Sequence, residues 1–186
     1  MDQPFQTMAQ ALDDLRTAIR TTPFDANVVA DMISTLIEHN LDDEQETNQV
    51  LGHAIGILGA MSPKLCLLTI TAAIDKSVHG SRTEQMLVEK WEGLINGHPL
   101  GSRKILFGQA CLAFYHSGRS GMRQAAAHEI IELSSHVEIP KAMPAVHAVV
   151  DFAAEFKLAG LSEEATNCLA RLDHAKRHAG QGRMPA

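Results

Sequence analysis

Apolar residues recur at steps of three and four along almost the whole chain. The first series is Phe5, Met8, Leu12, Leu15 and Ile19. This spacing places apolar side chains on one face of an α-helix. Similar series predict further helices at about 25–39, 43–61, 63–79, 82–96, 101–117, 120–137, 141–159 and 162–178. We therefore expect an all-α protein of about nine antiparallel helices.

The predicted helices start about every 20 residues, so that pairs of helices repeat about every 40 residues. A regular series of helical hairpins is typical of an α-solenoid-like array, and a compact helical bundle is the alternative. We expect a single domain over residues 1–179, with an N-terminal helix at 1–20, and a flexible tail at 180–186. The hairpins are expected at residues 23–61, 63–96, 99–137 and 140–178.

Proline and histidine mark the predicted helix ends. A proline stands near the start of the first helix of each hairpin, at Pro23, Pro63, Pro99 and Pro140. Proline is tolerated there because the first N–H groups of a helix have no helical partner. Histidines stand near the ends of the first three of these helices, at His39, His79 and His116, and the fourth is expected to end at Ala159-Gly160. An imidazole in a last turn can bind free carbonyl groups.

The last hairpin carries large and small residues at a distinctive spacing, at Phe152, Ala153, Phe156, Gly160, Ala165 and Leu169. In this spacing, residues 149–172 resemble a hairpin of the tetratricopeptide repeat. Part of the pattern returns at Phe107, Cys111, Phe114 and Gly118, although Arg123 stands where the repeat has alanine. The resemblance implies a stacked helical array with a concave surface for partner proteins.

Two features of the central helices predict close packing. Gly52, Gly56 and Gly59 fall on one side of the helix predicted at 43–61, where we expect another backbone to approach closely. The run from Leu65 to Ile74 is apolar on all sides, which predicts the most buried helix of the molecule. Trp91, the single tryptophan, lies among leucine and isoleucine residues and is expected in the core.

Composition narrows the class of protein. The N-terminus, MDQPFQ, lacks the basic start and apolar core of a signal peptide, and the longest apolar run is about half of the roughly 20 residues that span a bilayer. We therefore expect a cytoplasmic protein without a membrane span. The net charge of −6 argues against general nucleic-acid binding. The three cysteines lack a CxxC pair, so buried thiols are expected rather than disulfides or a zinc site.

The charges are distributed unevenly along the chain. Residues 21–63 contain seven acidic residues and neither Lys nor Arg, whereas residues 93–128 contain four cations and no acid. Such asymmetry can steer charged partners toward the protein. The candidate partner-binding residues are Asp42, Asp43 and Glu46 in the acidic segment and Arg103, Lys104, Arg119 and Arg123 in the basic one.

The stretch AAAHEIIELSSH raises the alternative of a metal site. Its HEIIE core, residues 128–132, differs from the HExxH signature of zinc proteases at the second histidine. On one long helix His128, Glu132 and His136 would form a row that can share a metal ion, and His147 is a candidate further ligand. The competing interpretation is an ordinary polar helix face.

Two further motifs have alternative interpretations. Residues 118–121, with Arg119 and Arg123, could bind an anion at a helix N-terminus or could form a tight turn between helices. His174 and His178 stand four residues apart on the last helix. They could bind zinc or nickel, or they could complement the C-terminal helix dipole together with Lys176 and Arg177.

These patterns favour a non-enzymatic interaction module without a cofactor, which acts as an adaptor, chaperone or regulator and binds a peptide or helix of a partner protein. A metal-binding helical enzyme or sensor that uses the HExxE stretch is one alternative. The other alternative is a self-assembling structural component, which would be a homo-oligomer.

Overall fold

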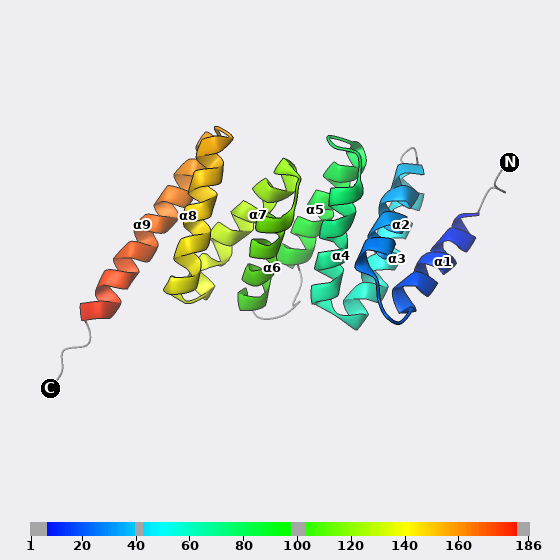
Figure 1. The fold of residues 1–186 in the computed structure, drawn as a ribbon, viewed down its shortest axis with the longest axis horizontal. Helices are drawn as coiled ribbons and strands as arrows, with labels where there is room; N and C mark the ends of the chain where they lie inside the picture. The colour runs from blue at the N-terminus through cyan, green and yellow to red at the C-terminus, as the bar shows by residue number, and fades with distance from the viewer. Residues whose placement is uncertain (1–6, 40–42, 98–102, 182–186) are drawn as a thin grey trace. The chain divides into compact units, whose positions relative to one another are not determined.

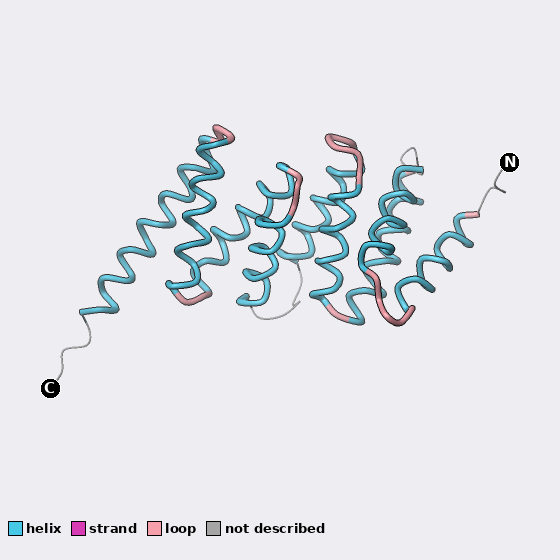
Figure 2. Tube along the Cα trace, viewed as in Figure 1, coloured by secondary structure: helices cyan, strands magenta, loops and turns pink. Residues whose placement is uncertain are grey.

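The computed structural model describes residues 7–39, 43–97 and 103–181. Within these ranges all regular secondary structure is helical, which confirms the predicted all-α fold (Figures 1 and 2). The α-helices are α1 (Met8–Arg20), α2 (Ala26–His39), α3 (Glu44–Met61), α4 (Pro63–Lys76), α5 (Arg82–Gly97), α6 (Arg103–His116), α7 (Ser120–Leu133), α8 (Ile139–Glu155) and α9 (Ala159–Gln181). A short 3-10 helix, η1 (Ser134–His136), follows α7.

The chain divides into two compact units. The first consists of residues 1–98 and 117–122, and the second of residues 99–116 and 123–186. Consecutive helices pack as pairs in both units, for example α2 with α3, α4 with α5, and α8 with α9. The single domain predicted over residues 1–179 stays a prediction. Contacts within each unit do not show whether the two units unfold together as one domain.

Side-chain caps define several helix starts. Ser62 accepts a hydrogen bond from the Leu65 N–H and caps α4, and Pro63 occupies the first turn as predicted. Pro140 likewise lies in the first turn of α8. The prediction for Pro23 is wrong, because α2 begins at Ala26 after the Asp25 carboxylate, which accepts hydrogen bonds from two backbone N–H groups. Pro99 lies outside the described residues.

The predicted role of histidine at helix ends is confirmed only in part. The Nδ1 atom of His39 lies 2.7 Å from the Thr35 carbonyl oxygen, in the last turn of α2. His116 is the last residue of α6. The prediction for His79 is wrong, since α4 ends at Lys76 and His79 lies in the following loop.

The first unit is built around α4, which contacts α2, α3 and α5. Ile70 and Ile74 of α4 and Trp91 of α5 are fully buried, so the prediction for Trp91 is confirmed. The prediction that α4 is the most buried helix is wrong among the described residues, because α7 contains more buried residues than α4 and Leu68 of α4 is 44% exposed. A helix at the centre of a unit therefore still presents one narrow strip to solvent.

The glycine face of α3 does not pack as predicted. A Cβ atom added to Gly52, Gly56 or Gly59 would meet no atom of the described residues within 4 Å. The reason lies in the opposite face of α3, where Val50, Leu58 and their neighbours are buried. This apolar face turns toward the core and leaves the glycines on the outside.

The second unit contains an aromatic cluster. The ring of Phe152 in α8 lies edge-to-face with Phe114 of α6, at a centroid distance of 5.3 Å. Phe156 lies 4.8 Å from Phe152 on the other side. The buried residues of α9 include Ala165 and Cys168. Small residues here allow α8 and α9 to pack closely.

The boundary between α8 and α9 differs from the prediction. α8 ends at Glu155, and Lys157 takes the left-handed conformation with φ 57°. The Leu158 N–H then donates to the Ala153 carbonyl at 2.9 Å, a hydrogen-bond pattern that ends helices. The predicted helix end at Ala159-Gly160 is therefore wrong. Lys157 takes the left-handed conformation, and Ala159 and Gly160 belong to the first turn of α9.

Burial along α4 predicts a contrast between two substitutions. Ile70→Ala should lower the free energy of unfolding by about 2–5 kcal/mol, because it leaves a cavity in the core. Leu68→Ala, on the exposed strip of the same helix, should change it by less than about 1 kcal/mol. Urea denaturation followed by the fluorescence of Trp91 measures both values. Equal losses would contradict the assigned packing of α4.

Candidate functional site

Exposed apolar side chains gather on the first helices of the hairpins. Among the described residues the large ones are Val28, Met61, Leu68, Val78, Ile105, Leu112, Tyr115 and Phe156. Five of these lie on α2, α4 and α6, and α6 alone carries three. Ile105, Leu112 and Tyr115 are 49%, 42% and 54% exposed, and their spacing places them on one side of α6. We name these three residues the α6 stripe.

Two predicted partner-binding residues lie at the start of α6, the helix that carries the α6 stripe. Arg103 and Lys104 are exposed in the first turn of α6. The Lys104 ammonium lies 3.6 Å from a carboxylate oxygen of Glu138, and Lys141 lies 3.1 Å from the other oxygen. Hydrogen bonding and charge from Lys141, followed by the charge of Lys104, lower the pKa of Glu138. Arg103 forms no ion pair with a described residue, so its charge is available to a partner.

Arg123 is used inside the second unit. Its guanidinium carbon lies 4.5 Å from the ring centroid of Phe152 and 5.1 Å from that of Phe114. Its Nε donates a hydrogen bond to the Phe114 carbonyl at 3.1 Å. Cation–π contacts and a hydrogen bond thus hold this cation against the aromatic cluster.

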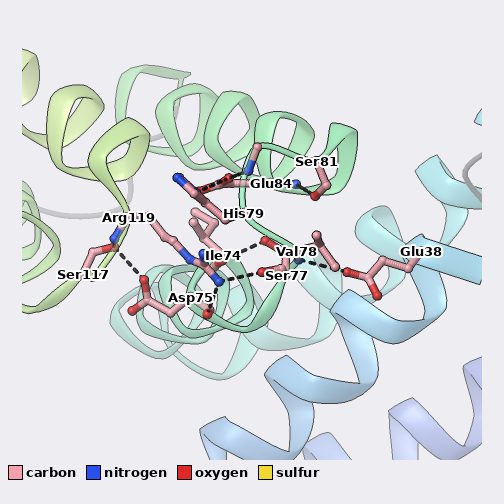
Figure 3. A network of polar contacts seen from close by, with 11 residues as sticks. Glu38, Ile74, Asp75, Ser77, Val78, His79, Ser81, Glu84, Ser117 and Arg119 are labelled. Carbon is pink, nitrogen blue, oxygen red and sulfur yellow. Dashed lines mark hydrogen bonds and ion pairs between the residues drawn. The ribbon is translucent and has the colours of Figure 1, made fainter.

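Arg119 is also used internally, in the polar network of the first unit (Figure 3). Its Nη2 atom donates to the carbonyls of Asp75 and Ser77, at 2.8 and 2.6 Å. Ser117 donates to the Asp75 carboxylate at 2.6 Å and accepts from the Arg119 N–H. The guanidinium therefore binds free carbonyls at the end of α4. This arrangement favours a tight turn over an anion site at residues 118–121.

The loop between α4 and α5 completes the network of Figure 3. Glu38 of α2 accepts a hydrogen bond from the Val78 N–H at 3.2 Å. The buried carboxylate of Glu84 accepts one from the Gly80 N–H and lies 3.2 Å from His79. Gly80 has a φ of 73°, a conformation that favours glycine. Side chains from two helices thus hold this loop in place.

A sequence signal for part of this network exists in the capping-box pattern Ser-x-x-Glu at residues 81–84. Ser81 accepts a hydrogen bond from the Glu84 N–H at 3.1 Å. The pattern identifies both residues from the sequence alone. The contacts of Glu38, Asp75 and Arg119 have no such local signal, because their partners lie about 40 residues away in the sequence.

Of the acidic residues predicted to bind a partner, Asp43 has a structural role at a helix start. Asp43 caps α3 by accepting a hydrogen bond from the Glu46 N–H at 3.0 Å, and Asp42 lies outside the described residues.

Asp14 and Asp31 line a hollow of about 280 Å³ between α1 and α2, together with Ala11, Met32, Thr35 and Leu36. A hollow of about 410 Å³ between α3 and α5 has a mixed lining of Asn48, Leu51, Arg82, Gln85, Met86, Glu89 and Lys90.

The proposed metal row of the HExxE stretch does not form. α7 ends at Leu133 and continues into η1, so His136 leaves the α-helical spacing that would align it with His128 and Glu132. The Nδ1 atom of His128 instead lies 3.1 Å from Glu164 of α9. No group of three or more potential ligands forms among the described residues, and His147 joins none. Within this stretch Glu132 is exposed and His128 is half-buried, whereas Glu129 is buried.

The cysteines lack the features of activated nucleophiles. Cys66 and Cys168 are buried, and Cys111 is half-buried. Burial raises the pKa of Cys66 and of Cys111 to about 11, so both stay protonated near neutral pH. The expectation of inert, largely buried thiols is consistent with this environment.

Comparisons of the chain with protein-family models, with curated proteins and with solved structures found no match. In the part of the chain that the structure describes, no helix has the length and hydropathy of a membrane span. The site must therefore be interpreted from its own chemistry.

The contacts of Arg119 predict a loss of stability that other cations do not share. Arg119→Ala should lower the free energy of unfolding by about 1.5–3 kcal/mol, because two carbonyls lose a charged donor. Arg119→Lys should restore only part of this loss, since an ammonium group cannot reproduce the planar guanidinium. Arg103→Ala is the matched control and should stay within about 0.5 kcal/mol. Urea denaturation measures all three, and a neutral Arg119→Ala would contradict the structural role.

Proposed function

We propose that this protein is a non-enzymatic interaction module that binds a peptide or helix of a partner protein, as an adaptor, chaperone or regulator. The α6 stripe is the observation that carries the proposal. Three large apolar side chains lie on one side of a single helix with about half of their surface in water. Covering such residues contributes roughly 25 cal/mol for each Å² of apolar surface removed from water.

The charges around the α6 stripe define the partner. Arg103 and Lys104 are exposed in the first turn of α6, where Lys104 also pairs with Glu138 and Arg103 forms no ion pair with a described residue. An amphipathic helix with apolar residues at i, i+3 or i+4, and i+7 would cover the stripe. Acidic residues on its flank would pair with the two cations and favour this partner over a basic one.

The acidic first third supports a second contact with basic residues of the partner. Asp14 and Asp31 stand at the hollow between α1 and α2, beside the apolar side chains of Met32 and Leu36. Asp31 also lies 3.5 Å from Lys76, so part of its charge is balanced within the chain. We assign this surface the secondary role for that reason.

The repeat character belongs to the same proposal. We infer a tetratricopeptide-like hairpin in α8 and α9, supported by the burial of Phe152, Ala153 and Ala165 at the positions where the pattern has large and small residues. Helical-hairpin arrays present an extended concave surface to partner proteins, and α6, which carries the α6 stripe, is the first helix of its predicted hairpin.

The test compares two leucines of similar exposure on corresponding helices. The partner is first identified by cross-linking in the native cells, and its dissociation constant is then measured by calorimetry with the purified chain. Leu112→Glu should weaken binding at least tenfold, or about 1.4 kcal/mol, by placing a charge in the stripe. Leu68→Glu, on α4, is the control and should change the affinity less than twofold.

Two further results distinguish the alternatives. Arg103→Glu should weaken binding and reduce its dependence on salt, since one cation of the interface is lost. Equal binding by the Leu112→Glu and Leu68→Glu variants would reject the α6 stripe as the interface. A dimer in light scattering that Leu112→Glu converts to a monomer would instead support a self-assembling component.

A further inference from the structure

The last turns of α9 carry a closely spaced pair of histidines. His174 and His178 lie four residues apart, and their Nε2 atoms are 3.1 Å from one another. The ring centroids are 4.3 Å apart. Leu172 of α9 is buried, and residues 174–178 are all exposed. The C-terminal end of α9 lies apart from α8 in Figure 1, so the pair is open to ligands from solution.

We propose that His174 and His178 together bind one divalent transition-metal ion of the copper, nickel and zinc class. Metal–imidazole bonds are about 2.0–2.1 Å long, so two nitrogens on the same ion lie roughly 2.9–3.4 Å apart at tetrahedral or right angles. The observed distance of 3.1 Å falls within this range. The pair therefore holds its two donor atoms near the separation that chelation requires.

The same geometry also fits a hydrogen bond between two neutral rings, in which one Nε2–H donates to the other nitrogen. A metal ion replaces that single proton and uses the lone pairs of both nitrogens. The ring that carried the proton on Nε2 then carries it on Nδ1, so both imidazoles stay neutral. Chelation thus requires a change of tautomer and little movement of the backbone.

The surroundings set the type of metal and the coordination. Imidazole nitrogen suits copper, nickel and zinc, whereas magnesium and calcium prefer oxygen ligands. No third His, Cys, Asp or Glu completes the group within the described residues. Water, or a donor from another molecule, would fill the remaining positions. Arg171 and Arg177 lie near in sequence, and their charges should weaken the binding of a cation without preventing it.

Binding has a structural consequence that is independent of the proposed partner function. A metal ion that bridges positions four residues apart ties together successive turns of a helix. Between Leu172 and His178 no side chain of α9 is buried, so these turns have little other support. Metal should therefore slow amide hydrogen exchange in the last turns of α9 and leave exchange in α4 unchanged.

The experiment uses the full chain, untagged and freed of metal by a chelator, with calorimetric titration of Cu²⁺, Ni²⁺, Zn²⁺ and Mg²⁺. We expect one ion of the first three per chain, no competition from Mg²⁺, and loss of binding as the pH falls from about 8 to about 5 because protonated imidazole is not a ligand. His174→Ala and His178→Ala should each weaken binding at least tenfold. His116→Ala, an exposed histidine on α6, should change it less than twofold.

A spacing variant separates chelation from general binding by histidine. The double variant Lys176→His with His178→Ala keeps the number of histidines but places the second one on the far side of the helix. It should bind as weakly as His178→Ala alone, with an unchanged circular dichroism spectrum. Unweakened binding by this variant or by His174→Ala, or no binding by the native chain, would overturn the proposal. Slowed exchange at the end of α9 only in the native chain would support it.

Discussion

The burial of α4 is the constraint on which the first unit depends. This helix contacts α2, α3 and α5, and its apolar residues supply the centre of the core. A helix buried in this way also takes the polar groups of its ends out of water, and those groups need partners. Ser62 meets this need at the start of α4, and Arg119 meets it at the end, by donating to the carbonyls of Asp75 and Ser77. The polar network is therefore a consequence of hydrophobic packing.

The second unit meets a similar requirement with different chemistry. Arg123 lies against the rings of Phe114 and Phe152 and donates to a backbone carbonyl. The guanidinium combines a flat apolar face with directed N–H donors, which suits it to an aromatic cluster near a helix end. Three of the four cations in the basic segment thus have partners inside their own units, because Lys104 also pairs with Glu138. Arg103, exposed in the first turn of α6, forms no ion pair with a described residue and keeps its charge for other molecules.

Most cations of the basic segment thus serve contacts within the chain, and the α6 stripe remains exposed. An exposed apolar stripe flanked by cations costs solubility unless a partner covers it, and this cost supports a role in binding. The histidine pair at the end of α9 is a different kind of feature, since it concerns metal ions and lies where packing has ended. The two proposals rest on different residues and can succeed or fail separately.

The sequence alone determined the secondary structure and most of the helix boundaries. Apolar spacing identifies the helices because the 3.6-residue period is a local property of the backbone, and Ser62-Pro63 identifies the start of α4 by local capping chemistry. The same pattern placed Trp91 in the core. It also predicted the packing of α2 with α3, α4 with α5 and α8 with α9, because short loops bring consecutive helices together.

Only the tertiary structure decided which side chains are available to other molecules. Local patterns made Arg119 and Arg123 equal candidates with Arg103, and they made the glycines of α3 a contact surface. The structure assigned both inner arginines to carbonyls and rings, and it left the glycine face open. It also separated His136 from His128 by ending α7 early. The partners of the arginines, the exposure of the glycines and the end of α7 all depend on groups that are distant in the sequence. The helical period of the sequence does not say which distant groups meet.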